Sequence, residues 1–185
     1  MNHKGTVTLE TERLILRRYD INDAGDIFGN WTSSESVTRF LTWQPHKDLG
    51  EARGYIQYCL DEYSKPDCYN WIIEYREIGR AVGSISVVWS CEDVACAEVG
   101  YCLSDKYWGK GIMPEALRAV IRFLFEEVGY NRIQATHDVR NPNSGRVMEK
   151  CGMRYEGTMR QASRNNQGVC DSVMRAILRS DYETE

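Results

Sequence analysis

The sequence lacks the features that mark membrane, secreted and nucleic-acid-binding proteins. No apolar run is long enough to span a bilayer, and residues 1–4 do not lead into the apolar core of a signal peptide. Lysine and arginine form no basic run, and the formal net charge is -4. A nucleic-acid-binding protein usually needs a positive patch that neutralises phosphates. We therefore predict a cytoplasmic protein with neither a membrane nor a nucleic acid as its main partner.

The spacings typical of metal sites and disulfide frameworks are missing as well. The seven cysteines are odd in number, no C-x-x-C occurs, and the three histidines are far apart in the sequence. Zinc sites and disulfide frameworks depend on regular spacings of these residues. Reduced, mostly buried thiols are the ordinary alternative. We therefore predict no metal centre.

The composition that is present suits one ordinary globular domain. The chain has 185 residues, of which 42% are hydrophobic and 27% charged. This length provides one full core and is short for two domains. We predict a single domain over residues 1–185, as a monomer or a homodimer. The mildly acidic balance also favours a cationic substrate.

A turn that contains two glycines is the most informative segment. Residues 106–113 join a predicted strand to a predicted helix that begins near Pro114. Proline is tolerated in a first turn because its missing N–H would have no intrahelical partner there. Gly109 and Gly111 lack a Cβ atom, so an anion can approach the backbone closely. First-turn N–H groups and the helix dipole attract negative charge, so the turn predicts a phosphate site.

Two common phosphate motifs do not fit this turn. A Walker loop needs G-x-x-x-x-G-K-[ST], and a dinucleotide fingerprint needs a third glycine where Pro114 stands. The remaining pattern is K-x-x-G-x-G, with added positive charge from Lys106 and Lys110. It resembles the pyrophosphate-binding motif of the GNAT superfamily, the acetyl-CoA-dependent N-acetyltransferases. Gln or Arg is usual in that superfamily where Lys106 stands.

Two further segments add to this resemblance. Residues 11–18, TERLILRR, resemble the opening strand of the Rim-type acetyltransferases of protein N-termini. The stretch Asn141-x-Asn143-Ser144, followed by E-K-x-G, resembles the GNAT helix that lies along the pantetheine arm of the cofactor. With these segments, the resemblance covers essentially the whole chain.

The resemblance implies an α+β fold in α/β/α layers. Its sheet would be mixed, largely antiparallel and of about seven strands, flanked by helices, with one splayed strand pair that binds acetyl-CoA. The periodicities and turn residues agree with this order. Strands are predicted at 6–17 (one bent or two short strands), 68–75, 81–89, 95–103, 132–137, 153–159 and 169–178. Helices are predicted at 22–31 with Asn22 as the cap, 33–41, 48–63, 114–128 and 141–151.

The resemblance also implies which residues bind acetyl-CoA. They belong to the end of the splayed strand, to the glycine turn and to the start of the short helix. The set is Cys102, Leu103, Lys106, Trp108, Gly109, Lys110, Gly111, Ile112, Met113, Asn141, Asn143 and Ser144.

Acetyl transfer to nitrogen requires a neutral amine. A lysine side chain has a pKa of about 10.4 and an α-amine about 7.7 to 8, so the α-amine needs only a weak base. Glu98 resembles the carboxylate that some family members use as base, often through water, and an exposed strand carboxylate is the alternative. Ser144 either reaches the thioester sulfur or is an ordinary first-turn serine. Met148 stands where many GNAT enzymes have a tyrosine acid, and methionine cannot donate a proton.

The combination of a serine at position 144 with no tyrosine at position 148 resembles the pattern of the Rim-type branch. We therefore expect an N-acetyltransferase that acts on a primary amine, foremost the α-amino group of a protein or peptide such as a ribosomal protein. Two alternatives stay open. One is a polyamine or aminoglycoside as the acceptor, and the other is a non-catalytic acyl-CoA-binding module.

Overall fold

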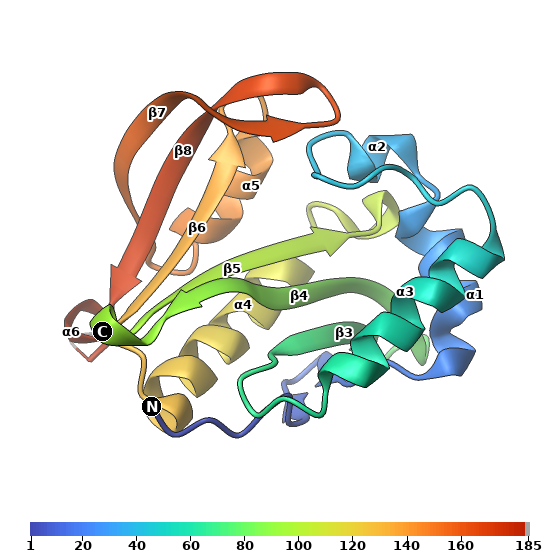
Figure 1. Cartoon of the computed structure of the whole chain (residues 1–185), viewed down its shortest axis with the longest axis horizontal. Helices are drawn as coiled ribbons and strands as arrows, with labels where there is room; N and C mark the ends of the chain where they lie inside the picture. The colour runs from blue at the N-terminus through green and yellow to red at the C-terminus, as the bar shows by residue number, and fades with distance from the viewer. Residues whose placement is uncertain (184–185) are drawn as a thin grey trace.

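The chain folds around one mixed sheet. The computed structural model describes residues 1–183, and within them eight strands lie in the order β1-β2-β3-β4-β5-β6-β8-β7 (Figure 1). The strands are β1 Leu9–Glu10, β2 Leu14–Arg17, β3 Asn70–Tyr75, β4 Arg80–Cys91, β5 Cys96–Leu103, β6 Arg132–Asp138, β7 Arg154–Asn165 and β8 Gly168–Leu178. Every neighbouring pair is antiparallel except β5 and β6. The predicted α+β fold is confirmed, with eight strands rather than about seven because residues 6–17 form two strands.

Helices cover both faces of this sheet. They are α1 Ala24–Ile27, α2 Glu35–Thr38, α3 Leu49–Glu62, α4 Ile112–Phe123, α5 Pro142–Glu149 and α6 Arg179–Tyr182. Helix α4 packs on one face, whereas α1 and α3 pack on the other (Figure 1). None of the helices in residues 1–183 combines the length and hydrophobicity needed to cross a membrane.

Helix α4 carries the larger part of the core. Its apolar residues recur at helical spacing, and Ala116, Leu117 and Val120 are fully buried against the sheet. Burying a leucine or valine side chain in this way contributes about 1.5–3 kcal/mol. Gly129 ends the helical segment in the left-handed conformation, with φ of 99°. The helix therefore holds the turn that precedes it rigidly against the end of β5.

The predicted helix at 22–31 is wrong in detail. Residues 21–32 form successive 3-10, α and π turns instead of one helix. Asp20, rather than Asn22, is the cap, because its carboxylate accepts from the Asn22 backbone N–H at 2.8 Å. Gly25 and Gly29 have low helix propensity, which explains why a regular helix is not maintained.

Strands β5 and β6 pair over a short distance and then separate. Their parallel register covers only 96–98 against 132–134, whereas β4 pairs with β5 as far as Leu103. Strand β6 continues alongside β8 to Asp138. The structure therefore contains the predicted splayed pair, and the gap opens at residues 99–103.

The β7–β8 hairpin reaches across to the segment after α2 (Figure 1). Asn166 at its tip donates from its backbone N–H to the Leu41 carbonyl, and its side-chain amide donates to the carbonyls of Thr38 and Trp43 at 2.8 Å. Gln44 donates to the Asn166 amide oxygen. These bonds attach the last hairpin of the chain to the first third and place α2 beside the gap.

Candidate active site

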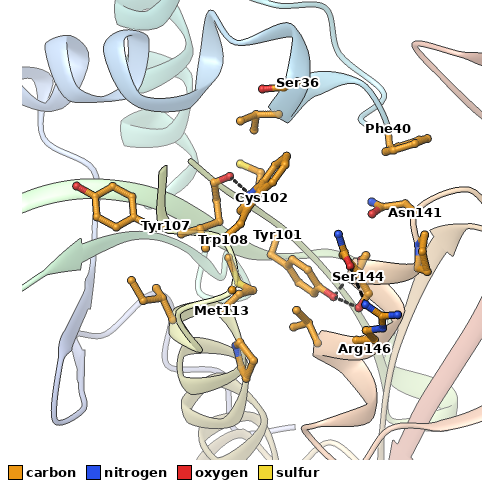
Figure 2. Close-up of a pocket in the computed structure, with 18 of the residues that line it drawn as sticks. Ser36, Phe40, Tyr101, Cys102, Tyr107, Trp108, Met113, Asn141, Ser144 and Arg146 are labelled. Atoms are coloured by element: carbon orange, nitrogen blue, oxygen red, sulfur yellow. Dashed lines mark hydrogen bonds between the residues drawn. The ribbon is translucent and has the colours of Figure 1, made fainter. Parts of the chain in front are cut away.

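A cavity of about 550 Å³ lies at the splayed strands. It is bounded by the α2 segment, the end of β5, the glycine turn and the start of α5 (Figure 2). Every predicted cofactor residue except Lys106 and Lys110 lines it. The lining residues from that set are Cys102, Leu103, Trp108, Gly109, Gly111, Ile112, Met113, Asn141, Asn143 and Ser144.

The positive charge of the cavity comes from residues that the sequence interpretation missed. Arg39, Arg140, Arg146 and Lys150 line it. Arg140 is fixed by Asp138, whose carboxylate it meets at 2.6 Å, and this bond holds the pKa of Asp138 well below its usual value. Arg140, Arg146 and Lys150 flank the N-x-N-S segment in the sequence. Their concentration around this motif could have indicated that they line the cavity. They suit a ligand that carries several phosphates.

Lys106 and Lys110 lie outside the cavity lining. The Lys110 ammonium stands over the ring of Tyr107, 5.0 Å from its centroid. Tyr107 itself lines the cavity, so this cation–π contact keeps the Lys110 charge beside the cavity without making it a lining residue.

Two left-handed glycines shape the backbone of the glycine turn. Gly109 and Gly111 both have φ of 75°, a left-handed conformation that favours glycine. Gly111 is the N-cap of α4 and has no side chain that could accept from the first-turn N–H groups. Those donors and the helix dipole remain directed at the cavity wall formed by the turn.

The opening segment of the chain clamps this turn from behind. Glu115, in the first turn of α4, accepts from the Thr11 hydroxyl at 2.6 Å, the Arg13 backbone N–H at 3.0 Å and Arg13 Nε at 2.6 Å. Arg13 Nη1 donates to the Lys110 carbonyl at 3.0 Å. Partial burial opposes ionisation of Glu115, but these hydrogen bonds outweigh it and lower its pKa. The TERL stretch therefore supports the glycine turn.

We expect Arg13→Ala to raise the KM for a ligand bound at this turn about tenfold, with a smaller change in kcat. The variant removes two tertiary bonds that hold the turn, and tenfold corresponds to about 1.4 kcal/mol. The matched control is Arg154→Ala, which removes an ion pair with Asp181 that belongs neither to the clamp nor to the cavity lining. Equal effects of the two variants in steady-state kinetics would refute the clamp.

Trp108 connects the turn to the end of β5. Its indole N–H donates to the Leu103 carbonyl at 2.8 Å, while half of the side chain stays exposed at the cavity. The indole therefore occupies one lone pair of the Leu103 carbonyl. The bond fixes the turn relative to the strand, so the cavity wall is preorganised.

Ser144 lies in the first turn of α5 and faces the cavity (Figure 2). Its hydroxyl and its carbonyl oxygen lie 3.1 Å and 3.0 Å from the hydroxyl of Tyr101 on β5. Asn141, the N-cap of α5, makes no side-chain capping bond. Met148 is buried in the core, with 1% of its surface exposed, and does not line the cavity. Ser144, which the sequence analysis named, and Tyr101, which it did not name, both line the cavity.

Glu98 occupies a different place. It lies at the last position where β5 pairs with β6. Its carboxylate accepts hydrogen bonds from Gln134 Nε2 at 2.9 Å and from Thr136 Oγ1 at 3.2 Å. It does not line the cavity. Alternation places Glu98 and Cys102 on one face of β5, and four residues of strand span about 13 Å. A proton can therefore pass from the cavity to Glu98 only through intervening water or side chains.

Among residues 1–183, histidine, cysteine, aspartate and glutamate form no group of three arranged to hold an ion. The Cys102 thiol contacts the Ser84 hydroxyl at 3.2 Å, and burial raises the pKa of Cys102 to about 11. This thiol stays protonated at neutral pH, so it is a poor nucleophile.

Known proteins resemble the chain over nearly its whole length. A family model described as an acetyltransferase (GNAT) domain matches residues 13–154. The probable N-acetyltransferase YjcK of Bacillus subtilis (strain 168) is 34% identical over 180 residues, which cover 95% of this chain and 99% of that protein. A crystal structure of a GNAT-family acetyltransferase from Bacillus anthracis superposes with a TM-score of 0.82 at 25% identity, over 94% of this chain and 99% of that chain.

A shorter match concerns an enzyme with a named substrate. The ribosomal protein uS5-alanine N-acetyltransferase of Escherichia coli (strain K12) is 31% identical over 84 residues, or 45% of this chain and 43% of that protein. The resemblance to the superfamily, including its Rim-type part, is confirmed by these matches. The chain belongs to the GNAT family of N-acetyltransferases, which take the acetyl group from acetyl-CoA.

Proposed function

We propose that this enzyme transfers the acetyl group of acetyl-CoA to the α-amino group of a protein or peptide. The observation that carries the proposal is the charge of the cavity. Its lining residues, all within the described part of the chain, include four cationic side chains and neither a carboxylate nor a histidine. The cations suit the phosphates of the donor, and the acceptor amine meets no strong base.

This lining favours an amine that is already partly neutral. An α-amine has a pKa of about 7.7 to 8, so a substantial fraction is deprotonated near neutral pH, whereas a lysine amine at about 10.4 is almost fully charged. A distant carboxylate acting through water suffices for the former. The α-amine also agrees with the named substrate of the Escherichia coli relative.

The same lining opposes a polyamine or an aminoglycoside as the acceptor. Such molecules carry several positive charges, and the described lining offers no carboxylate to pair with them. The other alternative is a non-catalytic acyl-CoA-binding module. It predicts cofactor binding without any acetyl transfer, which a product assay tests directly.

In the proposed mechanism, the chain's residues have separate roles. The glycine turn and the cations bind the phosphates, and the open edge of residues 99–103 holds the pantetheine arm. Ser144 donates a hydrogen bond to the departing sulfur. Glu98 accepts the proton of the acceptor through water. Because the Cys102 thiol stays protonated, we propose direct transfer to the amine without an acylated enzyme.

The experiment is an acceptor panel with acetyl-CoA, read by mass spectrometry. It contains peptides with a free N-terminus, the same peptides with a blocked N-terminus and an internal lysine, a polyamine and an aminoglycoside. We expect acetylation on the free α-amine, with at least tenfold preference over the blocked peptides. Acetylation solely on the polyamine or the sugar amine would overturn the proposal, and binding without product would indicate the non-catalytic module.

A further inference from the structure

Tyr101 links the two sides of the splayed gap. Among the described residues, it is the one cavity-lining residue whose side chain hydrogen-bonds to Ser144. It extends from β5, and Ser144 belongs to α5, 43 residues later in the chain. Figure 2 shows the phenol hydroxyl directed at Ser144 beside the cavity. The hydroxyl lies 3.0 Å from the Ser144 carbonyl oxygen and 3.1 Å from Ser144 Oγ.

One phenol proton must choose between these two acceptors. A tyrosine hydroxyl has one proton to donate, and a serine hydroxyl has one proton and two lone pairs. If Tyr101 donates to the carbonyl, Ser144 donates back to the phenol oxygen and its proton points away from the cavity. If Tyr101 donates to Oγ, the serine proton is free to point into the cavity.

We propose that Tyr101 is a positioning residue that donates to Ser144 Oγ and thereby turns the serine proton toward the sulfur of the acyl donor. Negative charge on the sulfur selects this arrangement, because a hydrogen bond to a charged acceptor is stronger than one between neutral groups. This inference rests on the proposed acetyl transfer. It assigns to a strand residue the support that Met148 cannot give from the helix.

The environment of Tyr101 keeps its proton in place. Burial raises the pKa of Tyr101 well above its ordinary value, and the bond to Ser144 offsets only part of that effect. The phenol is therefore a neutral donor throughout the working pH range. A first-turn serine without such a partner tends to bond to backbone carbonyls of its own helix, which would turn its proton away from the cavity.

The chemical step balances without transfer of the phenol proton. The acceptor nitrogen uses its lone pair to form the N–C bond, and the C–S bond breaks with its electron pair going to sulfur. The proton lost by nitrogen passes through water to Glu98, which then releases it to the solvent. Ser144 hydrogen-bonds to the sulfur as charge develops, and the released thiolate takes its proton from water.

The test titrates the thiol of CoA bound to the enzyme, read by the ultraviolet absorbance of the thiolate. We expect wild-type enzyme to lower the pKa of the bound thiol by about one unit relative to free CoA, since the two hydroxyls stabilise the thiolate. Tyr101→Phe should lose more than half of this shift, and Ser144→Ala nearly all of it. In single-turnover acetyl transfer, Tyr101→Phe should be about tenfold slower, with the KM for acetyl-CoA changed less than threefold.

A double variant separates positioning from a merely structural role. Tyr101→Phe added to Ser144→Ala should cause no further loss of either readout, because Tyr101 acts through the serine. The matched control is Tyr63→Phe, which removes another tertiary tyrosine bond, to the Asn70 carbonyl at 2.8 Å, away from the cavity. It should leave both readouts unchanged.

The outcomes are distinct. Additive losses in the double variant, or a normal thiol shift in Tyr101→Phe when Ser144→Ala loses it, overturn the inference. A normal thiol shift in a wild-type enzyme that acetylates no amine overturns the proposed function and leaves the hydroxyl pair intact. If Tyr101→Phe does not fold, 3-fluorotyrosine at position 101 replaces it. This analogue keeps the shape and donates more strongly, so a larger thiol shift supports the inference and an unchanged shift overturns it.

Discussion

Replacing Gly111 by valine is expected to weaken acetyl-CoA binding about a hundredfold, which corresponds to about 2.8 kcal/mol. Gly111 lines the cavity and has φ of 75°, where a β-branched residue is strained. A Cβ there has only Arg13 Nη2, at 3.5 Å, within 4 Å. A valine would therefore strain the backbone on the side of the turn that Arg13 holds. Relief of that strain would shift the turn, and the first-turn N–H groups would lose their alignment.

The matched control for this variant is Gly79→Val. Gly79 has φ of 58°, a Cβ atom at this position would meet no other atom within 4 Å, and the residue lies in the β3–β4 turn outside the cavity lining. The substitution imposes comparable backbone strain without reaching the ligand. Calorimetry on both folded variants should show normal affinity for Gly79→Val and a strong loss for Gly111→Val. Equal affinities would place the pyrophosphate elsewhere.

Replacing Glu98 by glutamine is expected to lower kcat by about 10²–10⁴-fold, the usual range for one general base. The amide cannot accept the proton, so the acidic limb of the pH–rate profile should also change. Glutamine is nearly the same size and can keep a hydrogen bond with Gln134 or Thr136, which limits the structural disturbance. The position of Glu98 outside the cavity makes this a demanding test of transfer through water.

Glu74→Gln is the matched control for this second variant. Glu74, on β3, is also a partly buried strand carboxylate. It forms an ion pair with Arg17 of β2 and does not line the cavity. Turnover across pH with a peptide acceptor should fall only for Glu98→Gln. Full activity of that variant would assign the base role to another group or to solvent.

Local chemistry explains why the glycine turn was predictable. Gly109, Gly111 and Pro114 restrict the backbone through their own covalent structure, so their spacing indicates a strand-to-helix turn without knowledge of any partner. The caps Ser34 and Asp48 are local in the same sense, and both accept from backbone N–H groups three residues later. Apolar periodicity likewise predicted α4 and its buried side.

Long-range contacts could not be predicted in this way. The clamp joins Arg13 to Glu115, 102 residues apart, and Asn166 bonds to Thr38 across 128 residues. Neither pair has a spacing that indicates its partner, because the contacts follow from strand order and register. The same limit explains why Arg39 was missed as a lining residue and why Lys106 and Lys110 were included.

The sequence by itself determined that a glycine turn precedes an amphipathic helix, and that a serine lies in the first turn of the helix after the splayed strand. These features depend on backbone restrictions and periodicity that act over a few residues. Only the tertiary structure decided which hydroxyl faces Ser144, which cations line the cavity and that Glu98 stands apart from it. Those relations depend on where β5 and β6 separate, and this register is set by the packing of the whole sheet.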